Sequence, residues 1–164
     1  MVATSFKSGK FINVPNHLDA IKKLGKKFSL CRIIDKNPSV IKLLKKKKLP
    51  VSKSILDIKI AKKNEIFIIC TPSTDRLDIV KYLINIKAKN IIIEKPLSLS
   101  VKDGEKIKQL IKNNNINCFV NYHRRNINAI VSLKKEIQDC ISINVNYNNG
   151  LFNYASHAID IINF

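Results

Sequence analysis

The stretch IIIEKPLSLS, residues 91–100, places three isoleucines directly before Glu94, Lys95 and a proline. An uninterrupted run of β-branched apolar residues is typical of a parallel strand that is buried on both faces. Such a strand seldom ends in an adjacent acid and base unless the charges have partners or a function, because an unpaired buried charge is costly. The motif therefore predicts a buried strand over 90–94 with charged groups at its carboxyl end.

Strands and helices alternate on both sides of this motif. Amphipathic segments lie at 73–88 and 100–114, and Ser100 is the expected N-cap of the second. Strand-helix-strand units of this length predict an α/β fold with a doubly wound parallel sheet. The other expected strands are FSLCRII (28–34), EIFIICT (65–71) and INCFVNY (116–122).

The chain is expected to comprise two units, and the sequence pattern changes clearly after Lys134. Residues 1–122 form the α/β unit, and residues 123–164 form the beginning of a second, α+β unit. In the second unit CISINVNY (140–147) alternates polar and apolar residues as a half-buried strand does, and an apolar helix is expected from about Tyr154.

Composition favours a soluble, cytoplasmic protein. No apolar run reaches the length of a membrane span, and the first residues, MVATSFKSGK, lack the apolar stretch of a signal peptide. The four cysteines have no CxxC spacing, and three of them (Cys31, Cys70, Cys118) lie in apolar runs. Reduced, buried thiols are therefore expected in place of disulfides, and no metal site is expected.

The net charge of +18 raises the question of nucleic-acid binding, because clustered cations release counterions from phosphates. Lys, Ile and Asn dominate the sequence, as an AT-rich genome would impose on any protein, and only four of the 30 basic residues are Arg. The run Lys45 to Lys48 lies at the end of an expected helix, where cations complement the helix dipole. We therefore expect no nucleic-acid partner.

Polar residues follow three of the expected strands, where open parallel sheets bind their ligands. Asp35 could accept hydrogen bonds from the ribose hydroxyls of a dinucleotide and would repel a 2′-phosphate, so NAD is preferred and NADP remains possible. Thr71 and Pro72 begin a helix where a hydroxyl and free N–H groups can face a cofactor. Each residue also has a structural interpretation: Asp35 and Thr71 as helix caps, and Lys95 as a member of a structural ion pair.

In this order the motifs resemble the glucose-fructose oxidoreductase and inositol dehydrogenase family (Gfo/Idh/MocA), NAD(P)-dependent oxidoreductases of sugars. The resemblance implies a Rossmann-like domain over 1–122. Within the family, the sequence looks most similar to dehydrogenases that oxidise nucleotide-linked amino-sugars for surface polysaccharides. It also implies a homo-oligomer for the full-length family. The motifs that carry it are HLDAI (17–21), IIDKNPS (33–39), IFIICTPS (66–73), IIIEKPLSLS, VNYHRRNINAIVSLKKEI (120–137) and GLFNYASHAIDII (150–162).

The resemblance assigns roles to individual residues. Lys95 would lie beside the sugar and the nicotinamide, where an ammonium donates to the reacting hydroxyl. His157 matches a histidine that relays the proton of that hydroxyl, and the Asp of the same pattern is Asn153 here, which orients but cannot accept a proton. Glu94, Thr71 and Pro72 join the cofactor site. Without the resemblance, His157 would be interpreted as a histidine paired with Asp160.

Two features depart from the family pattern. Gly9 stands where the glycine-rich pyrophosphate turn is expected, but Phe11 and Val14 occupy further glycine positions. The sequence ends at Phe164, where the family continues with a large antiparallel sheet, so a truncated chain is expected. Two hypotheses follow: a nicotinamide-dependent sugar or nucleotide-sugar oxidoreductase, or a catalytically inactive Rossmann-like fragment that binds nucleotide weakly or pairs with another protein.

Overall fold

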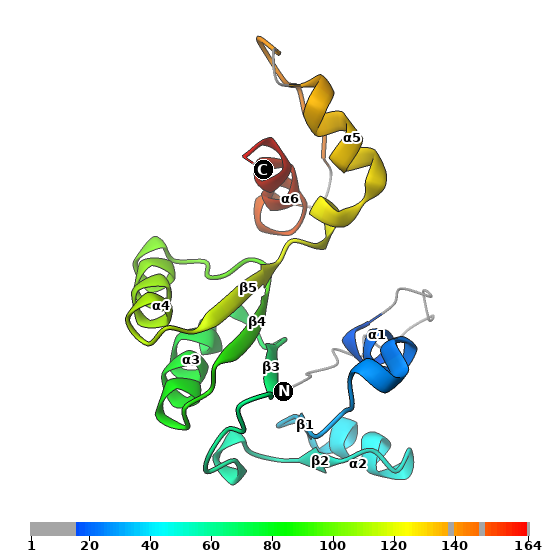
Figure 1. The fold of residues 1–164 in the computed structure, drawn as a ribbon, viewed down its shortest axis with the longest axis vertical. Helices are drawn as coiled ribbons and strands as arrows, with labels where there is room; N and C mark the ends of the chain where they lie inside the picture. Colours follow the sequence, from blue (N-terminus) through cyan, green and yellow to red (C-terminus); the bar gives the residue numbers. More distant parts are fainter. Residues whose placement is uncertain (1–15, 138–139, 148–149, 164) are drawn as a thin grey trace.

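The structure, a computed structural model, describes residues 16–137, 140–147 and 150–163. Strands and helices alternate along the chain in the expected order (Figure 1). The strands are β1 (Ile33–Ile34), β2 (Val51–Ser52), β3 (Ile66–Ile69), β4 (Asn90–Glu94) and β5 (Asn117–Asn121). The α-helices are α1 (His17–Leu24), α2 (Pro38–Lys46), α3 (Arg76–Asn85), α4 (Val101–Asn113), α5 (Asn128–Glu136) and α6 (Ser156–Ile162).

The described strands pair in parallel as two groups. β1 pairs with β2, and β4 lies between β3 and β5. The register aligns Ile69 with Ile93, and Glu94 with Asn121, so the carboxyl ends of the three strands meet at one edge. Figure 1 shows α3 and α4 on one side of this sheet, α1 on the other, and α5 and α6 beyond the end of β5. The prediction of a parallel α/β fold is confirmed.

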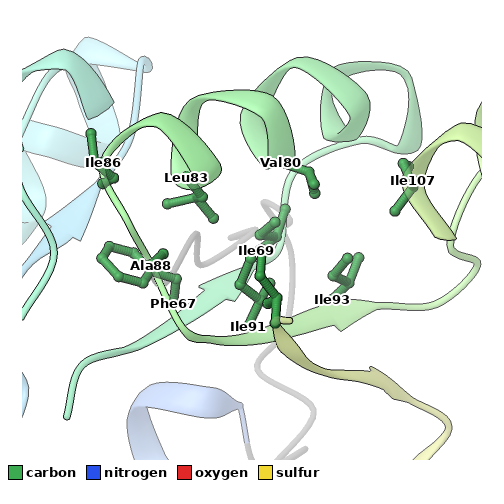
Figure 2. Close-up of a cluster of buried hydrophobic side chains, with 10 residues drawn as sticks. Phe67, Ile69, Val80, Leu83, Ile86, Ala88, Ile91, Ile93 and Ile107 are labelled. Carbon is green, nitrogen blue, oxygen red and sulfur yellow. The ribbon is translucent and has the colours of Figure 1, made fainter. Parts of the chain in front are cut away.

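The main core fills the space between β3 to β5 and helices α3 and α4 (Figure 2). Ile69, Leu83 and Ile93 are completely buried in it, and burial of each such side chain stabilises the fold by about 1.5–3 kcal/mol. This packing holds β3 and β4 in place, so the residues directly after them occupy defined positions at the edge of the sheet. The cluster comprises Phe67, Ile69, Val80, Leu83, Ile86, Ala88, Ile91, Ile93, Ile107 and Ile116.

Side-chain caps explain where three helices begin. Asn16 accepts from the Asp19 amide before α1, Asn37 accepts from Ser39 before α2, and Ser100 accepts from Asp103 before α4. Each cap satisfies an amide that has no partner within its helix, which contributes about 1 kcal/mol. Ser100 therefore has the predicted role. Within the described ranges, no helix is both long and apolar enough to cross a membrane.

The first predicted strand, 28–34, was too long. Only Ile33 and Ile34 pair, with Val51 and Ser52, and both isoleucines are buried. The preceding residues have no strand partner in the described part of the chain, and Cys31 is exposed. An apolar run forms a strand only as far as a neighbouring strand supplies hydrogen-bond partners, so propensity alone overestimated its length. The prediction that Cys31 is buried was wrong for the same reason.

The predicted strand over 140–147 is also wrong. These residues have no regular secondary structure in the described region, and Ile141, Ile143 and Val145 are exposed. Alternation marks a half-buried strand only when another strand pairs with it and another layer covers it. The expected helix near the end of the chain is present as α6, preceded by a π-helical turn over Leu151–Ala155.

Candidate active site

Glu94 is the centre of a polar cluster at the carboxyl edge of the three-stranded sheet. Its Oε1 atom lies 2.6 Å from His17 Nε2 and accepts a hydrogen bond of 2.6 Å from Asn121 Nδ2. His17 comes from the first turn of α1, whereas Asn121 is the residue aligned with Glu94 on β5. One carboxylate therefore joins three elements that are far apart in the sequence.

The same contacts decide the charges of this cluster. Side-chain hydrogen bonding with Cys70 and with Glu94 raises the pKa of His17 to about 10, so the imidazole is protonated at neutral pH. Burial favours the neutral form of Glu94, but the hydrogen bonds from His17 and Asn121 outweigh it and lower the pKa of the carboxyl. Glu94 is thus a charged acceptor whose partners are already in place.

Arg76 ties the ends of β3 and β4 together from beneath this cluster. Its guanidinium donates to the carbonyl oxygen of Thr71, through Nε at 3.2 Å and Nη2 at 2.9 Å. Its Nη1 donates to the carbonyl oxygens of Glu94 and Pro96. Arg76 is only 4% exposed, and the planar fork of donors suits several carbonyls at once. Thr71 and the residues around Lys95 therefore lie side by side, as the sequence predicted for this edge.

Lys95 follows Glu94 directly and is half-buried at the carboxyl end of β4. Burial lowers the pKa of its ammonium, and the charges of Arg124 and Arg76 lower it further against the opposing effect of Glu94. Its strand neighbour Glu94 forms hydrogen bonds of 2.6 Å with both His17 and Asn121.

His157 lies near the start of α6 and is 3% exposed. Its ring packs edge-on against Tyr122, with centroids 5.8 Å apart, and against His123, at 5.1 Å. The Nδ1 atom is buried and has no hydrogen-bond partner among the described residues. Burial first, and then the charges of Arg124, Lys95 and His123, lower the pKa of His157 to about 4, so the ring is neutral at pH 7.

The alternative pairing of His157 with Asp160 is not present. Both carboxylate oxygens of Asp160 accept from Arg125, through Nε at 2.6 Å and through Nη2. This two-point ion pair joins α6 to the turn that follows β5, and Asp160 is buried. The pair holds α6 against the end of the sheet, which places His157 beside Tyr122.

The predicted cofactor residues have different surroundings. Asp35 lies half-buried after β1, and its Oδ1 accepts from the Asn37 amide at 2.8 Å, while Asn37 itself caps α2. The Thr71 hydroxyl is buried, caps no helix and has no partner in the described part. Pro72 is exposed beside it. Thr71 thus has an unused hydroxyl where a ligand group could bind.

Two predicted site residues lie outside what the structure describes. Gly9 falls in residues 1–15, together with Phe11 and Val14, and the side chain of Asn153 is not described. Their roles remain predictions. In the described ranges, no three His, Cys, Asp or Glu side chains come together as metal ligands.

Four residues of this edge were not predicted as site residues: His17, Arg76, Asn121 and Arg124. His17 stood in the quoted motif HLDAI, and Asn121 and Arg124 in the motif at 120–137, so the signal was present without an assigned role. Arg76 had no signal, because one Arg in an amphipathic helix is usually exposed. Only the fold places its side chain under two strand ends.

Parallel strands with helices on both sides, and polar residues gathered at their carboxyl ends, define a nucleotide-binding α/β protein of the Rossmann type. Residues 8–122 match the profile described as "Oxidoreductase family, NAD-binding Rossmann fold" (Gfo/Idh/MocA). The chain belongs to this oxidoreductase family, and NAD is the cofactor that the family's fold binds. No curated protein matches the sequence.

Solved structures agree on the fold. WlbA dehydrogenase from Bordetella pertussis, in complex with NADH and UDP-GlcNAcA, is 19% identical, with a TM-score of 0.72 over 90% of this chain and 50% of that chain. A putative NADPH-dependent oxidoreductase from Desulfitobacterium hafniense is 17% identical, with a TM-score of 0.70 over 88% and 49%. WlbA from Chromobacterium violaceum, with the same ligands, is 21% identical, with a TM-score of 0.63 over 74% and 35%. The chain spans half or less of the length of these three structures.

The described residues fit a nicotinamide dinucleotide. The buried Thr71 hydroxyl has no partner, and the Asp35 carboxylate retains an oxygen for which no hydrogen bond is observed. A carboxylate after the second strand of such a fold binds ribose hydroxyls, and ligands of open parallel sheets bind at the carboxyl ends of the strands, where Thr71 lies. Asp35 would hold the adenosine ribose, and Thr71 and Lys95 would lie at the other end of the cofactor.

Proposed function

We propose that this chain carries the cofactor site and two catalytic residues of an NAD-dependent oxidoreductase that acts on a hydroxyl of a sugar or nucleotide sugar. The observation that carries the proposal is a neutral, buried His157 whose Nδ1 has no partner, electrostatically coupled to a partly desolvated Lys95. Two WlbA structures that share the fold contain NADH and UDP-GlcNAcA.

Lys95 is proposed to bind the oxygen of the reacting hydroxyl. Oxidation of an alcohol develops negative charge on that oxygen, and an ammonium in a partly buried site stabilises it more than water does. Burial, together with the charges of Arg124 and Arg76, lowers the pKa of Lys95, which eases the sharing of its proton. When bound, NAD supplies the acceptor for the hydride.

His157 is proposed to accept the proton of the same hydroxyl. A base must be unprotonated to act, and with a pKa of about 4 His157 is neutral from below pH 5 upward. The edge-on packing of Tyr122 and His123 and the ion pair of Arg125 with Asp160 restrain the ring. Asn153 remains the proposed partner that orients the substrate.

The test is hydride transfer with UDP-GlcNAcA as the probe, followed by NADH absorbance. Lys95→Met and His157→Asn should each lower turnover by about 100-fold or more, while NAD affinity, measured by calorimetry, changes less than about twofold. Lys102→Met, at an exposed position of α4, is the control for loss of one lysine. Unchanged turnover in either site variant contradicts the proposal. NAD binding without any turnover in the unmodified chain would favour the non-catalytic nucleotide-binding alternative.

A further inference from the structure

Cationic side chains gather around His157. The charges of Arg124 and Lys95 both lower the pKa of His157, and the ring centroids of His123 and His157 lie 5.1 Å apart. Two carboxylates of this region already have hydrogen-bond partners. Glu94 accepts from His17 and Asn121, and Asp160 accepts twice from Arg125.

Arg124 occupies a defined position in this region. It lies in the turn His123–Asn126, which directly follows β5, three residues after Asn121 at the sheet edge. Its guanidinium carbon lies 5.5 Å from the centre of the Tyr154 ring, which faces it from the turn before α6. Arg124 forms no ion pair with a carboxylate among the described residues.

Arg124 therefore differs from its neighbour Arg125. Arg125 is committed to a structural ion pair, whereas the charge of Arg124 rests on an aromatic face and lowers the pKa values of both Lys95 and His157. Arg124 directly follows His123, whose ring centroid lies 5.1 Å from that of His157, so an anion bound near His157 would be within reach of a guanidinium that forms no ion pair among the described residues. The planar guanidinium binds carboxylate and phosphate oxygens through paired hydrogen bonds.

We propose that Arg124 is a specificity residue that binds an anionic substituent of the substrate, a carboxylate or a phosphate carried by the sugar, while Lys95 and His157 contact the reacting hydroxyl. The inference rests on the proposed function and narrows its substrate class from sugars in general to acidic ones. Tyr154 keeps the guanidinium in place through its ring face and leaves the outer N–H groups for the ligand.

The test compares matched sugars by calorimetry on the intact chain in the presence of NADH. The probes are D-glucuronate, glucose 6-phosphate and glucose, which separate carboxylate from phosphate and both from a neutral ring. Wild type should bind at least one of the two anions about tenfold or more tightly than glucose, and Arg124→Gln should remove this difference while glucose affinity stays unchanged. Arg124→Lys should restore part of it, because the charge returns without the paired donors.

Controls separate this site from the general charge of the protein. Lys102→Gln removes one charge from the exposed surface of α4 and should leave the preference intact. Equal affinities for acidic and neutral probes, no binding of either anion, or an unchanged preference in Arg124→Gln would each overturn the inference. If wild type preferred neutral sugars but hydride transfer still depended on Lys95, the anion site would be overturned and the proposed function would stand. An Arg124-dependent anion preference without that transfer would overturn the proposed function alone.

Discussion

At the scale of single residues, three charged side chains arrange the edge of the sheet. Arg76 and Asp160 are buried, Glu94 is half-buried, and each forms hydrogen bonds to residues of other elements. A buried charge is tolerated only when its partners are supplied by the fold. These residues therefore stabilise one particular arrangement of strand ends, and the positions of Lys95 and His157 depend on it.

Replacement of Arg76 should destabilise the protein more than replacement of any exposed arginine. Arg76→Met keeps the aliphatic bulk but leaves the carbonyls of Thr71, Glu94 and Pro96 without their donor, at a cost of roughly 2–4 kcal/mol. Urea denaturation measures the change in the free energy of unfolding. Arg32→Met, at an exposed position, is the matched control and should change it by less than about 0.5 kcal/mol.

His17 should make stability depend on alkaline pH. Its pKa is raised from 6.5 to about 10, so the folded state holds a proton that the unfolded state releases above pH 6.5. The resulting stabilisation is fully present below pH 6.5 and is lost as pH rises towards 10. Urea denaturation at a series of pH values should show a decline from pH 7 to 9.5 that is shallower in His17→Asn. The exposed residue His123 supplies the control variant His123→Asn, and parallel curves for wild type and His17→Asn would contradict the assignment.

At the scale of elements, backbone conformation separates two glycines that look alike in the sequence. Gly104 lies inside α4 with ordinary helical geometry, and an added Cβ would meet only the Ser98 Cβ at 3.9 Å. Gly25 ends α1 with φ of 52°, in the left-handed region where a side chain is strained although the space is open. Local geometry, and not crowding, decides what each position tolerates.

The two alanine substitutions should therefore have opposite signs. Gly104→Ala should raise the free energy of unfolding by about 0.5–1 kcal/mol, because the unfolded chain loses freedom and the helix gains a better former. Gly25→Ala should lower it by about 1 kcal/mol or more. Thermal unfolding followed by circular dichroism compares both with wild type. A stabilising Gly25→Ala would mean that α1 ends differently from the structure.

At the scale of the whole molecule, the carboxyl ends of β3, β4 and β5 meet at one edge of the sheet, and α6 lies beyond the end of β5 (Figure 1). Lys36 and Asp75 form an ion pair of 3.4 Å between the segments after β1 and after β3, although 39 positions separate them. Asp35 therefore belongs to the same face as Thr71 and Arg76. A dinucleotide bound along this face would contact residues that follow β1 and β3.

Cofactor choice follows from this arrangement. NAD should bind about tenfold or more tightly than NADP, because the Asp35 carboxylate would face the 2′ position and repel a phosphate there. The neighbouring Lys36 forms an ion pair of 3.4 Å with Asp75. Calorimetric titration with both cofactors checks this preference, and Asp35→Ser should reduce it. The exposed residue Asp57 supplies the control Asp57→Ser, and tighter binding of NADP by wild type would contradict the prediction.

Much of the fold follows from local sequence. Runs of β-branched residues between amphipathic helices predicted β3, β4, β5, α3 and α4 within a few residues, because the spacing of apolar residues in each segment matches its periodicity and its buried face. The positions of Asp35, Thr71 and Lys95 at strand ends followed from the same pattern. The short β1 and the absence of a strand over 140–147 did not, because a strand needs a partner that its own residues do not specify.

The sequence by itself determined which residue types stand at the carboxyl ends of the strands, since strand bounds and polar residues are both local. Only the tertiary structure decided which of them meet. His17 and Glu94 are 77 positions apart, and Arg125 and Asp160 are 35 apart, so no periodicity links them. Such pairs form because the packed helices and strands bring their polar side chains together out of water, where each must find a partner. The neutral state of His157 has the same origin, because burial and surrounding cations are properties of the assembled fold.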